Sequence, residues 1–189
     1  MSKAELTKRA IAESFRTLLE VMPLEKVTVS AIAKHTGINR QTFYYHFHDI
    51  YDLVKWIYLS GIEGAMGARV TRQNWRGALI ALLENLYQDH DFVSRTMHGV
   101  SGSFAHRFLQ DEASALVRSV VDSEATNYTA SDEDIGLMTS FFAAGFIQTL
   151  YAWIANGMHE NPERLVNRIG TMLEGTLEGS LERLSMPTV

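Results

Sequence analysis

Apolar residues recur at helical spacing along most of the chain, and alternating patterns typical of strands are nearly absent. The first predicted helix covers residues 4–21 and carries apolar residues at spacings of 4, 3 and 4, at Ile11, Phe15, Leu18 and Met22. Pro23 ends it. Further helices are predicted from Thr28 to Gly37, from Asn39 to about His46, from Asp49 onward, and over 74–89, 103–123, 132–157 and 162–184. The pattern predicts an all-α fold.

Residues 28–47, TVSAIAKHTGINRQTFYYHF, predict two short helices that meet at a sharp turn. Gly37 tolerates the left-handed backbone that such a turn requires. Ala33 is small where two crossing helices must come close, and Ile32, Ile38 and Phe43 are spaced to fill the angle between them. This arrangement predicts a helix-turn-helix motif, whose second helix is built to enter a DNA major groove.

The second helix of this motif carries a dense set of hydrogen-bonding and aromatic side chains over about two turns. Arg and Gln read guanine and adenine edges, and a Thr methyl group or an aromatic edge can contact a thymine methyl group. The alternative is a surface helix with a solvated polar face. The coincidence of turn glycine, small residue and aromatic-polar cluster favours DNA reading by residues from the set Arg40, Gln41, Thr42, Tyr44, Tyr45 and His46.

The string TGINRQTFYYHFHDIYDLV resembles the N-terminal DNA-binding domain of TetR-type (TetR/AcrR) transcriptional regulators, and the resemblance covers about residues 5–58. Within that family, the form NRQTFYYHF…DIYDLVKWIY resembles regulators associated with dihydroxyacetone kinase genes. The resemblance implies three N-terminal helices for DNA, a fourth helix as connector, and a C-terminal helical body for effector binding and dimerisation. The implied domains are a helix-turn-helix DNA-binding domain over 1–48 and a ligand-binding and dimerisation domain over 49–189.

The resemblance also assigns roles to single positions. It implies base contacts by Arg40, Gln41, Thr42 and Tyr45, and phosphate contacts by Thr28, Ser30, Tyr44 and His46. Phosphate contacts set the register, and base contacts specify the sequence. One position departs from the family, which often has a phosphate-binding lysine two residues into the fourth helix. This chain has Ile50 there, and Lys55 is too far along the helix to be assumed as its replacement.

The charges are distributed unevenly. Residues 1–58 hold eight Lys and Arg against six Asp and Glu, a net charge of +2. Residues 59–189 hold nine against sixteen, a net charge of −7, and all five lysines lie within the first 55 residues. A basic head on an acidic body favours a polyanion as partner of the head, although an excess this small also arises by chance.

Several classes of site are not expected. The chain has no cysteine, which excludes a disulfide framework, a cysteine-based zinc site and a cysteine nucleophile. The seven histidines do not form a helical metal-binding pattern, and no Gly-rich phosphate loop or nucleophile elbow is present. We therefore expect no metal, no cofactor and no enzymatic activity. The charged N-terminal segment lacks the apolar stretch of a signal peptide, and a cytoplasmic location is expected.

Residues 135–158 form a stretch of 24 residues without Asp, Glu, Lys or Arg, long enough to cross a bilayer. Polar residues within it and the lack of basic flanks favour a helix buried on most faces by protein, with a partner subunit as cover, over a membrane span. The expected dimer is a two-fold four-helix interface built from 132–157 and 162–184. Loose packing within one chain is the alternative. The expected contact residues are Ala144, Leu173, Gly175, Leu177 and Gly179.

The body gives little information on the effector. Aromatic residues at these spacings form plain core more often than a cavity. The pocket residues to be expected, if there is a pocket, are His98, His106, Phe142, Gln148 and Tyr151. The expected function is binding of a palindromic operator as a homodimer, with an effector that moves the fourth helix and changes the spacing of the two heads. The alternative is a regulator, which includes the case of an activator, whose signal is a partner protein instead of a small molecule.

Overall fold

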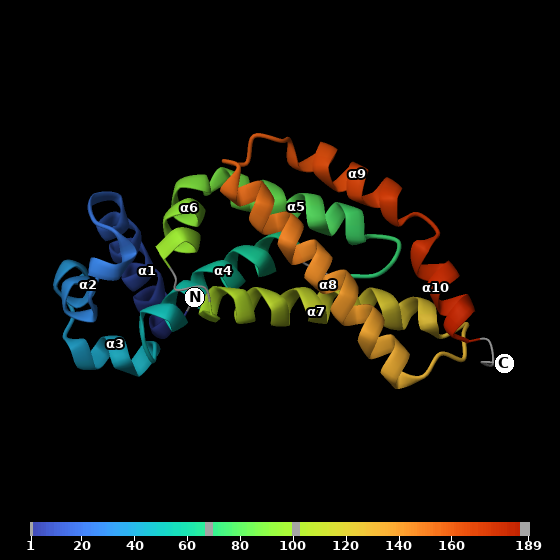
Figure 1. Ribbon diagram of the computed structural model, residues 1–189. Helices are drawn as coiled ribbons and strands as arrows, with labels where there is room; N and C mark the ends of the chain where they lie inside the picture. Colours follow the sequence, from blue (N-terminus) through green and yellow to red (C-terminus); the bar gives the residue numbers. More distant parts are fainter. Residues whose placement is uncertain (1, 67–69, 100–102, 186–189) are drawn as a thin grey trace. The chain divides into compact units, whose positions relative to one another are not determined.

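The computed structural model describes residues 2–66, 70–99 and 103–185, and every regular element in these ranges is a helix (Figure 1). The all-α prediction is confirmed. In chain order the elements are α1 (Lys3–Val21), the short 3₁₀ turn η1 (Leu24–Lys26), α2 (Val29–Thr36), α3 (Arg40–His46), α4 (Ile50–Met66), α5 (Trp75–Gln88), α6 (His90–Gly99), α7 (Ser103–Ala125), α8 (Asp132–Ala155), α9 (Pro162–Leu173) and α10 (Thr176–Leu184).

The chain forms two compact units. The first comprises Met1–Ile62 and Asp89–Ala105, and the second comprises Glu63–Gln88 and His106–Val189. The first unit therefore includes most of α4 and all of α6 in addition to the residues of the expected domain 1–48. A division by function at residue 48 stays a prediction, because compactness reports packing and not the use of a surface.

The core of the first unit forms where α1, α2 and α3 meet. Ile11, Phe15, Ile32 and Phe43 are all fully buried. α1 packs on both α2 and α3, and α2 packs on α3. Of the three side chains predicted to fill the angle of the motif, Ile32 and Phe43 are thus part of one core with the apolar face of α1, and Ile38 is half-buried. The orientation of α3 is set by this shared core.

The turn between α2 and α3 has the predicted geometry. Gly37 adopts φ +77° and ψ 25° in the left-handed region. The Gly37 amide donates to the Lys34 carbonyl at 3.3 Å, and the Ile38 amide donates to the Ala33 carbonyl at 2.9 Å. These bonds satisfy the last carbonyls of α2 while the chain changes direction.

α6 was not predicted, although its sequence carried a signal. Asp89 precedes it, and the residues buried on its inner face, Phe92, Val93 and Thr96, follow the spacing of a helix. α5 ends at Gln88 and α6 starts at His90. With so short a break, the apolar pattern of the first helix masks the start of the second.

Polar and aromatic contacts hold α6 in the first unit. The Arg16 guanidinium pairs with Asp89 at 2.7 Å and lies 4.1 Å from the centre of the Phe92 ring. Arg95 donates to the carbonyl of Leu19 near the end of α1 at 3.1 Å. The hydroxyls of Tyr58 in α4 and Thr96 in α6 are 2.6 Å apart and buried. α6 is therefore joined to both α1 and α4.

In the second unit, α5 packs along α9, and α7 packs on α8 through a cluster of Ala113, Ala143 and Ile147 (Figure 1). The prediction of one helix over 162–184 is wrong. Gly175 adopts φ +69°, in the left-handed region, and separates α9 from α10. Gly175 therefore lies in a turn and not inside a continuous helix, and its place in the dimer interface stays a prediction.

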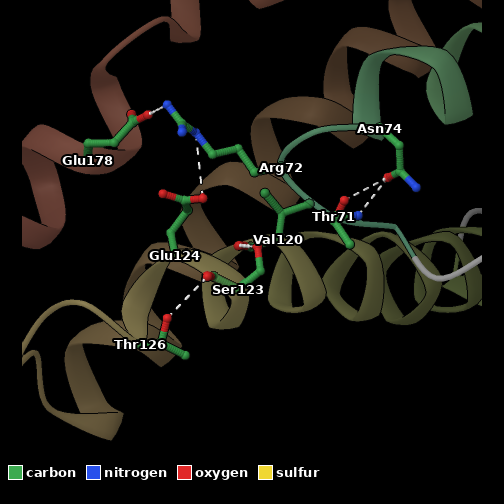
Figure 2. Close-up of polar contacts among 8 residues, drawn as sticks. All are labelled: Thr71, Arg72, Asn74, Val120, Ser123, Glu124, Thr126 and Glu178. Carbon is green, nitrogen blue, oxygen red and sulfur yellow. Dashed lines mark hydrogen bonds and ion pairs between the residues drawn. The ribbon is translucent and has the colours of Figure 1, made fainter.

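An arginine shared by two carboxylates joins three segments of the second unit (Figure 2). Arg72 precedes α5, and its Nε lies 3.6 Å from Glu124 near the end of α7. The Nη2 atom of Arg72 pairs with Glu178 in α10. The segment before α5 is itself fixed, because the Thr71 amide donates to the Asn74 side chain at 2.7 Å. Together with the buried Leu181, these contacts hold α10 after its break from α9.

We predict that Gly37→Ala lowers the free energy of unfolding by about 1–2 kcal/mol, because an L residue is strained in the left-handed region. The loss reports the backbone alone, since no atom lies within 4 Å of the added Cβ. Gly77→Ala is the matched control, because Gly77 lies in α5 and is equally free of neighbours. It should be neutral or stabilise by up to about 1 kcal/mol. Chemical unfolding of both variants measures this, and equal effects would contradict the role of the turn.

Candidate nucleic-acid interface

The start of α2 presents polar groups to solvent. Thr28 is the N-cap, and its hydroxyl oxygen accepts from the Ala31 amide at 3.1 Å. Thr28 and Ser30 are exposed, while Val27 and Leu24 just before them are buried. The buried pair anchors the segment, so that the two predicted phosphate-contacting side chains and the free N-terminal amides of α2 face outward. A helix N-terminus with exposed amides is suited to phosphate oxygens.

α3 is held by its cap and by one buried ring. The Asn39 side chain accepts from the Thr42 amide at 2.7 Å and from the Thr42 hydroxyl at 2.9 Å. Phe43 has no exposed surface. With Phe43 turned inward, Gln41 is exposed on the opposite side of the helix, and Arg40 is exposed at the first position of α3. Thr42 is half-buried, since its hydroxyl belongs to the cap.

The three aromatic residues that follow Phe43 in α3 differ in their exposure. Tyr45 is 83% exposed and Tyr44 is 49% exposed, whereas His46 is half-buried. The Tyr45 and His46 rings meet edge to face at 5.0 Å, and Tyr44 meets Phe43 in the same way at 5.7 Å. These ring contacts limit the directions that the exposed side chains can take. Two large exposed tyrosines on one short helix are typical of a binding surface.

The turn into α4 is capped by carboxylates. Asp49 accepts from the Asp52 amide at 2.8 Å, and Asp52 accepts from the His48 amide at 3.0 Å. This reciprocal pair starts α4 where the sequence predicted a cap by Asp49. Phe47, the residue after α3, is buried against Phe43 and Trp56 at ring distances of 5.8 Å in both cases. α3 and α4 are thus joined through one aromatic cluster.

The motif has a favourable charge for a polyanion. Residues 26–48 contain Lys26, Lys34 and Arg40 and no Asp or Glu. The surface formed by the start of α2 and the outer side of α3 therefore carries hydrogen-bond donors and positive charge without a competing carboxylate from its own segment. All eight residues predicted to contact bases or phosphates belong to this one stretch.

Three of the five expected effector-pocket residues have described side chains, and these three differ in their surroundings. The side chains of His98 and His106 lie outside the described residues. Gln148 is exposed on α8, Phe142 is half-buried beside Phe141, and Tyr151 packs against the cluster between α7 and α8. Burial raises the pKa of the Tyr151 hydroxyl above its usual value. Gln148 and Tyr151 thus differ in their surroundings, and a pocket formed by these residues stays a prediction.

The structure shows an open depression of about 450 Å³ between the end of α5 and the turn from α8 to α9. The turn includes two successive residues with positive φ, Gly157 at +73° and the buried Met158 at +54°. None of the expected pocket residues lines it. Its lining consists of Glu84, Tyr87, Gln88, Met158, His159, Glu160, Asn161 and Pro162.

α8 buries only part of its apolar surface within the chain. Eight of its residues are buried, but Leu137 is 67% exposed and Phe141 is 74% exposed. Ala144, Gly145 and Gln148 are also exposed and continue the same face at helical spacing. Among the described residues, α8 is the helix long and apolar enough to cross a membrane, with 33% of its most apolar window buried, a property that core helices of globular proteins share. Within a single chain one face of α8 is open, and this is the face for which a partner subunit is the expected cover; that cover stays a prediction.

Comparisons with known proteins match both units. Residues 16–57 match the family described as "Bacterial regulatory proteins, tetR family", and residues 73–175 match "Transcriptional regulator C-terminal region". A curated relative is the HTH-type dhaKLM operon transcriptional activator DhaS of Lactococcus lactis, which is 25% identical over 174 residues, covering 92% of this chain and 91% of the relative.

Two solved structures have the same fold. The dihydroxyacetone kinase operon activator DhaS matches with a TM-score of 0.66 and 22% identity, over 95% of this chain and 98% of that chain. A transcriptional regulator from Pseudomonas aeruginosa matches with a TM-score of 0.61 and 17% identity, over 97% of this chain and 96% of that chain. At these sequence identities the structural likeness shows the fold alone, and the family assignment rests on the two matched sequence families.

Proposed function

We propose a mechanism from the premise that the chain belongs to the TetR family and is a DNA-binding transcriptional regulator, not an enzyme. The chain uses α3 as its recognition helix and binds a palindromic operator as a homodimer. This proposal rests on the outer side of α3. Because Phe43 is buried, that side faces away from the core, and the segment to which it belongs contains no acidic residue. Sequencing the DNA fragments that the purified protein retains tests it, since a palindromic consensus is expected.

The base contacts come from the exposed residues of α3. Arg40 presents a fork of donors suited to guanine, and Gln41 has the donor and acceptor that match adenine. Tyr45 is 83% exposed, and its ring edge can contact a thymine methyl group. Thr42 contributes its methyl group, because its hydroxyl is held by the Asn39 cap. A helix of two turns therefore reads a few base pairs in each half-site.

Phosphate contacts on both sides of this helix set its depth and register. Thr28 and Ser30 supply hydroxyls and amides at the start of α2, and Tyr44 and His46 supply donors along α3. These groups contact the backbone of any DNA sequence, and they account for affinity more than for specificity. The proposal thus separates the two sets of residues by a measurable property, the ratio of specific to non-specific binding.

The open face of α8 is the proposed dimer interface. Leu137, Phe141 and Ala144 follow one another at spacings of 4 and 3, and the small residues Ala144 and Gly145 permit close approach of a second α8. Met172 in α9 is 75% exposed and adds apolar surface. Leu173, Leu177 and Gly179 are half-buried, and their place in the interface stays a proposal. Binding to a palindrome requires a two-fold axis that holds the two heads about one DNA turn apart, near 34–36 Å.

The effector would act on the spacing of the heads. α4 begins in the first unit and ends in the second, and it is joined to α6 by the buried Tyr58–Thr96 hydrogen bond. A ligand that favours one position of α4 and α6 shifts the population between a DNA-competent state and an incompetent one. A small molecule or a partner protein can supply this difference in affinity. The regulator would act in the cytoplasm, where bacterial DNA is accessible.

Activation is a second candidate for the direction of control. The curated relative DhaS is described as a transcriptional activator of an operon, and this chain matches it over 92% of its length. A reporter fused to the retained operator distinguishes the two directions. Loss of reporter expression after deletion of the regulator supports activation, whereas an increase supports repression.

We predict that Arg40→Ala and Gln41→Ala each weaken operator binding by about 1–3 kcal/mol and relax the preference at one base pair per half-site. Binding to random DNA should change less. Fluorescence anisotropy with operator and scrambled duplexes measures both affinities. If both variants lose equal affinity on the two duplexes, these residues contact phosphate only.

Tyr44→Phe and His46→Ala should weaken specific and non-specific binding to the same extent, because a phosphate contact does not depend on the base sequence. If the His46 ring is charged when bound to DNA, His46→Ala also removes one phosphate contact by a cation. The salt slope of this variant is then smaller than that of the unaltered protein by about one unit or less. The same anisotropy titrations, repeated at several salt concentrations, give both quantities. Unchanged affinity of both variants at low salt would show that these two side chains do not contact DNA.

The dimer interface is tested with Phe141→Glu. A charge on this exposed face leaves the folded chain intact but cannot be buried against a second copy, and the two-fold axis applies the penalty twice. Removing a central aromatic contact costs about 2 kcal/mol or more per copy. Sedimentation should show a dimer for the unaltered protein and a monomer near 21.3 kDa for the variant.

Tyr87→Glu is the matched control, because Tyr87 is half exposed on α5, away from the proposed face. This variant should stay dimeric. If the unaltered protein sediments as a monomer at tens of micromolar, both the proposed interface and the palindromic mechanism are contradicted.

A further inference from the structure

A lysine from α1 lies at the turn between α3 and α4, far in sequence from the DNA-binding motif. The ammonium group of Lys8 is 5.6 Å from the centre of the Phe47 ring and 5.8 Å from that of Trp56. Both distances are within the range of cation–π attraction. Phe47 ends α3 and Trp56 belongs to α4, so the charge is held beside the connection of these helices.

The charge of Lys8 is not used by an acidic side chain. Lys8 takes part in none of the ion pairs formed by the residues that the structure describes. Its neighbour Arg9, in contrast, pairs with Glu5. The acids of the turn, Asp49 and Asp52, accept from backbone amides at the start of α4. A half-buried lysine without a carboxylate partner keeps its positive charge available for an external anion.

The turn needs such a charge if DNA lies along α3. Residues 47–54 contain two aspartates and no lysine or arginine, so this end of the recognition helix would repel a phosphate on its own. Phe47 connects Lys8 with α3, because its ring also packs on Phe43 at 5.8 Å. The Lys8 ammonium therefore lies at the same end of α3 as Tyr44 and His46, the proposed phosphate contacts.

We propose that Lys8 binds a backbone phosphate of the operator at the C-terminal end of α3, and that Phe47 and Trp56 hold it in position. This inference rests on the proposed DNA-binding role of α3. The rings restrict the long side chain before DNA arrives, which lowers the entropy lost on binding. The contact is sequence-independent, so Lys8 adds affinity to any DNA and sets the position of the far end of the recognition helix.

The test is the salt dependence of DNA binding by Lys8→Met, which keeps an unbranched apolar stem against the rings and removes the charge. Loss of one phosphate contact per protomer lowers the salt slope by about 0.9, and thus by about 1.8 for a dimer. The affinity ratio of unaltered protein to variant should therefore shrink about twelvefold between roughly 50 and 200 mM salt. Operator and random duplexes should be affected equally.

Two further variants separate a phosphate contact from other effects. Lys8→Arg keeps the charge and the ring contact, and it should retain the salt slope of the unaltered protein. Arg9→Gln removes a neighbouring charge that is already paired with Glu5, and it should leave the slope nearly unchanged. An equal fall of the slope in Arg9→Gln would show a general charge effect and overturn the proposal.

A purely structural role of Lys8 gives a different result. In that case Lys8→Met lowers the melting temperature while the salt slope stays constant, and the proposal is wrong. Arg40→Ala, measured on the same duplexes, separates this failure from failure of the proposed function. If Arg40→Ala loses operator preference while Lys8→Met does not alter the slope, α3 reads DNA without help from Lys8. If the unaltered protein retains no DNA, the proposed operator binding itself fails.

Discussion

The burial of Phe43 is the contact on which the proposed DNA-binding surface depends. Its ring has no exposed area, contacts the Phe47 ring, and belongs to the helix that packs on α1 and α2. A helix of two turns has little stability of its own, so its rotation about its axis follows from the one side that it can bury. With Phe43 inward, Gln41 and Tyr45 lie on the opposite side of the helix and face solvent, and Arg40 is exposed at its first position. The surface for DNA is thus a consequence of core packing.

The same core connects the recognition helix with the elements that would carry a signal. α1 contributes Phe15 to this core, and the Phe15 ring meets Phe92 of α6 edge to face at 6.2 Å. Arg16 and Arg95 add polar contacts between α1 and the α6 segment. A displacement of α6 therefore changes contacts of the helix on which α2 and α3 pack. Packed side chains of this kind have few alternative arrangements, which makes a two-state response physically reasonable.

The main feature of the second unit is α8, a long helix with many apolar residues. The helix buries one face against α7 through small and branched side chains, and Ala143 is fully buried there. Its open face, with Leu137 and Phe141, is apolar enough to favour association. Arg72 pairs with Glu124 and Glu178 and so holds α10 in the same unit, although the chain breaks at Gly175 (Figure 2). A fixed body and an open face are the properties that a rigid dimer of two heads requires.

The sequence alone determined the local features, because these depend on neighbours along the chain. Periodicity predicted the all-α fold, Thr28, Asn39 and Asp49 marked helix starts, and Gly37 marked the left-handed turn. The family also followed from the sequence, since its motif lies in one continuous segment, and the matched families confirmed it. The roles of single residues in DNA contact stay predictions.

Only the tertiary structure decided features that join distant segments. A helical stripe does not show whether its glycine continues the helix or interrupts it; in the structure Gly175 interrupts it, and Arg72 and Leu181 hold α10 after the break. The short break after Gln88 concealed α6, whose position depends on Asp89, Phe92 and Thr96 meeting α1 and α4. Nothing in the sequence distinguishes Lys8 from other lysines. Only the fold places it against Phe47 and Trp56, because contacts between residues about 40 positions apart leave no periodic pattern in the sequence.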